Sequence, residues 1–140
     1  MSPCYYRVSV KALVVDEVGR FLLARESDGL WDFLGGGLDH GEDPIAALRR
    51  EITEESALVA THISPTPRYF VTAQKPDSEL FFAHVMYNVV LKDLAFTPSD
   101  ECQELKFFAP DEALELHTLP SMQKFVAAYS ASLPATQTRT

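Results

Sequence analysis

The stretch Gly36–Leu58, GGLDHGEDPIAALRREITEESAL, passes from a glycine-rich loop into an amphipathic helix. Asp43 followed by Pro44 predicts the helix start, because aspartate caps free N–H groups and proline at the first helical position sacrifices no hydrogen bond. We expect the helix to cover residues 44–56. Its apolar positions recur at helical spacing, at Ile45, Leu48 and Ile52.

Three glutamates share one face of this predicted helix. At about 100° per residue, Glu54 lies near −60° and Glu55 near +40° from Glu51, beside the apolar stripe, where they could line a cleft. Carboxylates at these spacings repel one another, although Arg50 can offset part of the repulsion through Glu54. The commonest role of such a cluster is a solvated acidic face. Oxygen ligands grouped this tightly are also what Mg²⁺ or Mn²⁺ requires.

The order of fixed residues resembles the signature of the Nudix family, G-x5-E-x7-R-E-U-x-E-E-x-G-U, in which U is a bulky aliphatic residue. Here Gly36 precedes Glu42 by the required spacing, and RREITEESAL ends the match. Ala57 replaces the last glycine, which raises the question of whether that backbone position needs a positive φ. The preceding WDFLGG resembles the family's W-x-x-P-G-G segment, with Leu34 in place of proline.

The resemblance implies an α/β fold, a Nudix-type α/β/α sandwich with a mixed central β-sheet, as a single domain over residues 1–140. It also implies a hydrolase that attacks a nucleotide pyrophosphate bond with water, using a divalent cation to neutralise the phosphate charge. The working substrate is a small nucleotide, such as a (d)NTP, ADP-ribose or a nucleotide sugar. Two alternatives are a Nudix-fold module that only binds a nucleotide or protein, and an acidic structural partner protein.

Carried over by position, Glu54 and Glu55 are the principal metal ligands for Mg²⁺, with Mn²⁺ as a substitute. Glu51 is then a third ligand or the base that orients the attacking water. The carbonyl group of Gly36 completes the implied metal site.

Similar proteins often use a further carboxylate, as ligand or base, from a loop before the last strand. Glu101 stands six residues before Phe107 in an equivalent place, with Asp100 and Glu104 as competitors. The general base is therefore either Glu51 or Glu101.

Four further residues have secondary roles in this interpretation. Glu42 and Arg50 would hold the loop against the helix through a charge-assisted contact. Arg25, at a predicted strand end, and His40, in the glycine loop, are candidates for substrate binding.

Composition limits the partners. With 20 acidic and 12 basic residues the net charge is −8, which argues against polymeric nucleic acid as a partner. Cys4 and Cys102 lack metal-site spacing and are expected to be free thiols. There is neither a leader pattern nor an apolar run of about 20 residues, so we expect no membrane partner and a cytoplasmic location. The resemblance leaves a homodimer open.

The remaining elements are predicted from the alternation of apolar and polar residues, in segments that are bounded by proline and glycine. Residues 6–15 and 20–25 predict a hairpin closed by Gly19. Residues 29–41 are expected to form a loop, and 134–140 a frayed tail. Further strands are predicted at 58–64, 68–73, 80–91 and 104–109. A short helix is predicted from residue 110, and a C-terminal helix at 120–133.

Overall fold

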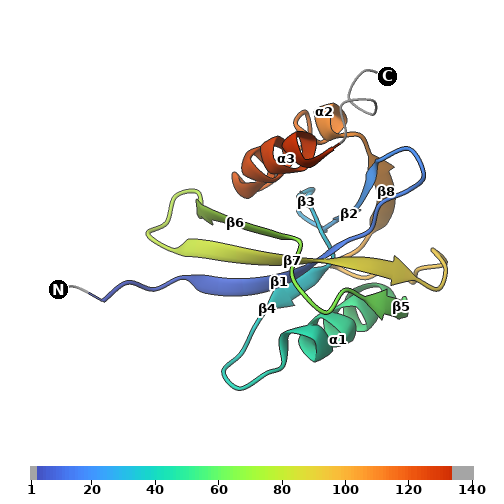
Figure 1. Cartoon of the computed structure of the whole chain (residues 1–140), viewed down its shortest axis with the longest axis horizontal. Coiled ribbons are helices and arrows are strands. Elements are labelled where there is room, and N and C mark those ends of the chain that lie inside the picture. The colour runs from blue at the N-terminus through green and yellow to red at the C-terminus, as the bar shows by residue number, and fades with distance from the viewer. Residues whose placement is uncertain (1–2, 134–140) are drawn as a thin grey trace.

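The computed structural model describes residues 3–133, so the tail expected at 134–140 lies outside the described residues. Two β-sheets lie between α1 on one side and α2 and α3 on the other (Figure 1). This arrangement confirms the α/β class and the mixed sheet. The elements are β1 (Arg7–Leu13), β2 (Phe21–Arg25), β3 (Trp31–Asp32), β4 (Gly35–Gly37), α1 (Pro44–Ser56), β5 (Ala60–Ile63), β6 (Tyr69–Gln74), β7 (Phe81–Leu91), β8 (Glu104–Phe108), α2 (Pro110–Ala113) and α3 (Ser121–Ser132).

The larger sheet is built around the long strand β7. Strand β1 pairs with β7 in parallel, from Arg7 opposite Phe82 to Leu13 opposite Asn88, and pairs with β4 in antiparallel orientation. Strands β5 and β6 are antiparallel to different parts of β7. The smaller sheet is antiparallel, in the order β3-β2-β8. A cleft lies between the two sheets, lined by Lys11 of β1 and Gly35 of β4 on one side and by Ala24 of β2 and Asp32 of β3 on the other.

The predicted hairpin is present, but its pairing is limited to the residues next to the turn. Gly19 takes a positive φ of 85°, and the two segments pair around it through an antiparallel bridge between Val15 and Phe21. Main-chain hydrogen bonds from Asp16 N–H to the Arg20 carbonyl, 2.9 Å, and from Leu22 N–H to the Val14 carbonyl, 3.0 Å, flank this bridge. Beyond that bridge β1 and β2 enter different sheets, because β4 and β7 occupy both edges of β1.

The glycine-rich segment was expected to be a loop, and that prediction is wrong, since it contains β3 and β4. Gly35 permits the close approach of β4 to β1, because a Cβ there would lie 2.0 Å from the carbonyl oxygen of Val10. Its φ of +139° is likewise suited to glycine. The chain thereby crosses from one sheet to the other immediately before α1.

Helix α1 forms where the sequence predicts it. The side chain of Asp43 accepts a hydrogen bond of 2.9 Å from the N–H of Ala46, and Pro44 is the first helical residue. Leu48 and Ile52 are fully buried against the larger sheet. Phe125 of α3 anchors the second core, on the opposite side. These contacts fix which face of α1 points toward the space between the sheets.

The end of α1 answers the question raised by Ala57, which adopts a left-handed conformation with φ 62° and ψ 13°. This conformation is costly for a residue with a Cβ atom, so we expect Ala57→Gly to raise the free energy of unfolding by about 1 kcal/mol. Chemical denaturation measures the change. Ala127→Gly, at an exposed position within α3, is the matched control and should lose about 1 kcal/mol. A less stable Ala57→Gly variant would contradict the prediction.

Candidate active site

The glutamates of α1 differ sharply in environment, although they share one helix face. Glu55 is only 8% exposed, and its carboxylate accepts a hydrogen bond of 2.8 Å from the N–H of Gly35. Burial raises the pKa of Glu55 to about 8, with a smaller contribution from the nearby Glu101 carboxylate. This raised pKa favours the protonated carboxyl of Glu55 at neutral pH, so a metal ion that binds there must displace the proton.

Glu101 reaches Glu55 from a tight loop that covers the end of α1. The Ser99 hydroxyl donates a hydrogen bond of 2.6 Å to the main-chain carbonyl of Glu55, and Ser99 also forms an isolated bridge with Cys102. Cys102 is fully buried and anchors the loop, while the N–H of Ser27 donates to the carbonyl of Asp100 at 2.8 Å. These contacts hold the exposed Glu101 side chain above the helix.

Three carboxylates converge at this point. Oxygen atoms of Glu51, Glu55 and Glu101 all lie within 4.8 Å of one another. Gly36 packs directly against the first of them, since a Cβ at this position would lie 2.7 Å from the Glu51 carboxylate. The glycine is therefore required by the close approach of β4 to α1. This cluster could hold a divalent cation.

Beside the cluster is a cleft of about 200 Å³ between the two sheets. It contains three charged residues that the sequence interpretation missed, namely Lys11, Glu26 and Asp32. Lys11 and Asp32 form an ion pair of 3.0 Å, with side chains only 9% and 14% exposed. Burial raises the pKa of Glu26, and the charge of Asp32 adds to this shift. A lysine inside the apolar stretch VKALVV was the one available sequence signal for this site.

Comparison with known proteins identifies the family. The NUDIX domain model matches residues 5–129. The chain belongs to the Nudix family. A CTP pyrophosphohydrolase from Escherichia coli (strain K12) is 30% identical over 131 residues, covering 89% of this chain and 92% of that protein. The match to a MutT-like protein from Streptomyces ambofaciens is 41% identical over 58 residues, 41% of this chain but only 38% of that protein.

Solved structures agree with this assignment. The crystal structure of a MutT protein from Methanosarcina mazei Go1 superimposes with a TM-score of 0.69 and 26% identity, covering 90% of this chain and 94% of that one. The protein is therefore a Nudix hydrolase, an enzyme of the class that hydrolyses pyrophosphate bonds in nucleotides.

The Nudix residue Glu54 lies outside the convergent cluster. Its side chain is 59% exposed and accepts a hydrogen bond of 3.0 Å from Arg50. Arg50 also contacts Glu42 at 2.9 Å and Glu51 at 3.2 Å, so the expected contact between Glu42 and the helix is present. Arg50 thus joins Glu42, in the loop before α1, to Glu51 and Glu54 on the helix in one ionic network.

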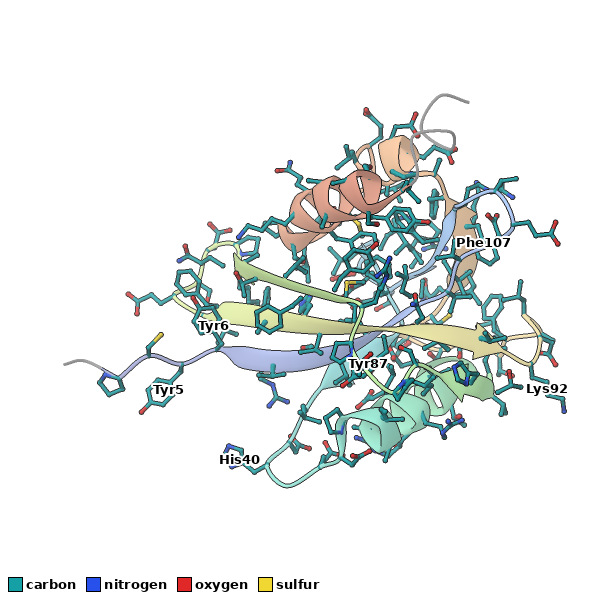
Figure 2. The ribbon with its side chains drawn as sticks, viewed as in Figure 1. Tyr5, Tyr6, His40, Tyr87, Lys92 and Phe107 are labelled. Atoms are coloured by element: carbon teal, nitrogen blue, oxygen red, sulfur yellow. The ribbon has the colours of Figure 1, made fainter. Side chains whose placement is uncertain are left out.

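The candidate substrate residues do not line the cleft. Ala24 and Glu26 line it, and the intervening Arg25 pairs instead with Glu104 at 3.3 Å on the neighbouring strand. Among the residues that the structure describes, Glu104 is not part of the group of three clustered carboxylates. His40 is exposed at the outer end of the loop between β4 and α1, where it points away from the sheets (Figure 2).

The helices of residues 3–133 are all too short or too polar to cross a membrane.

Proposed function

We propose that this Nudix hydrolase cleaves a pyrophosphate bond of a small nucleotide with the help of a divalent cation held by Glu51 and Glu55, with Glu101 beside them as a further ligand or as the base that accepts a proton from water. The observation that carries the proposal is the convergence of these three carboxylates at the mouth of the cleft. Glu54 and the carbonyl of Gly36 are further proposed ligands, on the basis of their positions in the Nudix signature. Arg50 would have to release Glu54 for it to join them.

The donor set fits Mg²⁺ or Mn²⁺. Mg²⁺ prefers oxygen ligands at about 2.0–2.1 Å, so ligands on opposite sides of the ion are about 4.2 Å apart. The observed separations of up to 4.8 Å need only small side-chain movements to reach this arrangement. When bound, the cation would neutralise phosphate charge and activate water for attack.

The chain itself supplies orientation and a proton acceptor. The N–H of Gly35 fixes the direction of the Glu55 carboxylate, and the packing of Gly36 fixes Glu51. Glu101 is exposed, and no ion pair within residues 3–133 involves it, so it is better placed than Glu51 to accept a proton from water at the cleft mouth. Glu51 is half-buried and already paired with Arg50, which makes it the less available base.

Nucleoside triphosphates are the proposed substrate class. The support is the relative named CTP pyrophosphohydrolase, which aligns with 89% of the chain. The free thiols of Cys4 and Cys102 fit a reducing compartment, so we propose that the enzyme acts in the cytoplasm. A homodimer stays a prediction.

A substrate panel tests the proposal. Pyrophosphate and phosphate release would be measured with ribo- and deoxynucleoside triphosphates, ADP-ribose, nucleotide sugars and dinucleoside polyphosphates, each with Mg²⁺, Mn²⁺ or EDTA. We expect at least one nucleoside triphosphate to be the best substrate and EDTA to abolish its turnover. Turnover that survives EDTA would refute the metal requirement, and preference for a nucleotide sugar or ADP-ribose would refute the substrate class.

The pKa of Glu55 gives a pH dependence for metal binding. Because this carboxyl has a pKa of about 8 without metal, a cation must displace its proton at lower pH. We expect affinity for Mn²⁺ to rise about tenfold per pH unit from 6 to 8 and then to level off. Titration calorimetry in buffers of different ionisation enthalpy would also detect about one proton released per ion at pH 7. Affinity that does not change between pH 6 and 8 would contradict the assignment of Glu55.

A further inference from the structure

Lys11 is a buried cation in a cleft that is otherwise acidic. It lies on β1 opposite Gly35, and the whole residue is 7% exposed. Its ammonium donates a hydrogen bond of 3.0 Å to Asp32 on β3, which belongs to the other sheet. The ion pair therefore joins the two sheets at the floor of the cleft.

The charges around Lys11 are unbalanced without it. Among the described residues that line the cleft, the acids are Glu26, Asp32, Glu55 and Glu101, and Lys11 is the only base. Burial disfavours its charge, yet attraction to Asp32 and, more weakly, to Glu55 and Glu26 keeps the pKa of Lys11 above its ordinary value. The ammonium therefore remains charged throughout the physiological pH range.

A carboxylate group in such a place requires a positive partner. Two or more carboxylates that face one another in a poorly solvated space are stable together only if a proton or a cation compensates their charge. Asp32 Oδ1 accepts the N–H of Phe33 at 2.8 Å, so Asp32 Oδ2 is the oxygen that depends on Lys11.

We propose that the Lys11 ammonium takes the place of a divalent cation at the floor of the cleft. It neutralises Asp32 permanently, with Glu26 and Glu55 nearby, so the enzyme binds one metal ion fewer than its carboxylates would otherwise attract. Lys11 is thereby a positioning residue, which keeps Asp32 in place while the cation site at the mouth is empty or filled. This inference rests on the proposed metal-dependent function.

The test is the number of Mn²⁺ ions bound per chain, measured by equilibrium dialysis with detection of free Mn²⁺ by electron paramagnetic resonance. Lys11→Met removes the charge and keeps much of the side-chain volume, so we expect it to bind one Mn²⁺ more than the unmodified protein. Lys11→Arg keeps the charge and should bind the original number. In Lys11→Met/Asp32→Asn the extra ion should be lost again. Lys92→Met, at an exposed position just beyond β7, is the control and should change nothing (Figure 2).

The same counts overturn the inference if Lys11→Met binds no additional ion. Where loss of the ion pair prevents folding, Lys11→Gln keeps a donor for Asp32 without the charge, and the same gain is expected. Should neither variant fold without metal, refolding in millimolar Mn²⁺ supports the inference, and failure to refold overturns it. If the unmodified protein binds no Mn²⁺, the proposed function fails separately. In that case, one Mn²⁺ bound to Lys11→Met would still support the role of Lys11. If Lys11→Met also binds no Mn²⁺, the role of Lys11 is overturned.

Discussion

Replacing Glu55 with glutamine is expected to lower kcat on the order of a thousandfold without loss of the fold. Glu55 is the most buried of the three convergent carboxylates, and its position is fixed by the N–H of Gly35. Glutamine keeps an oxygen that can accept this hydrogen bond, but it lacks the negative charge that would hold a cation. Steady-state kinetics at saturating Mg²⁺, together with Mn²⁺ titration, measures both losses.

Stability provides the internal check on this variant. The folded-state pKa of Glu55, about 8, lies above the ordinary value of 4.5, so between these pH values the unfolded chain releases a proton that the folded protein keeps, and the free energy of unfolding falls as the pH rises. Glu55→Gln removes this loss of stability. Without metal, its unfolding midpoint at pH 8 should therefore equal or exceed that of the unmodified protein. A large loss of stability would attribute the fall in kcat to misfolding instead.

Glu54→Gln is the matched comparison on the same helix face. Its carboxylate is exposed and bound to Arg50, so we expect a smaller fall in kcat than for Glu55→Gln. A fall of about a hundredfold would mean that Glu54 leaves Arg50 to join the ion. A change below about threefold would mean that the pairing with Arg50 is its main role. An effect larger than that of Glu55→Gln would contradict the order in which the geometry ranks the two residues.

Local chemistry made α1 predictable from the sequence, and non-local contacts limited the rest. Asp43, Pro44 and the spacing of Leu48 and Ile52 act within a few residues, and they set the helix start and its buried face. The predicted hairpin extends only a few residues from its turn, because the partners of β1 come from distant segments, β4 and β7. Turn residues can indicate a reversal of the chain, but they do not determine which strands pair afterwards.

The candidate site shows the same division. Glu51 and Glu55 were assigned to one helix face by angle alone, and the structure brings both into the cluster. The angle does not reveal that Glu55 is buried while Glu54 is exposed, because this depends on β4 and on the loop that carries Glu101. The pairing of Lys11 with Asp32 joins two sheets, and neither residue belongs to the Nudix signature, so no local pattern could have predicted it.

Glu101→Gln is expected to lower kcat by about a hundredfold or more, with a much smaller change in KM, if Glu101 accepts the proton from the attacking water. Its exposure allows contact with water, and the contacts of Ser99 and Cys102 hold it above Glu55. The pH profile gives a readout that a structural role would not move, because the variant should lose the dependence of kcat on an ionised base. Glu104→Gln is the control, since Glu104 pairs with Arg25 and should change kcat less than about threefold. If Glu104→Gln has the larger effect, the loop base is Glu104. If neither variant changes the profile, the base is Glu51, and the pairing with Arg50 must loosen before the reaction.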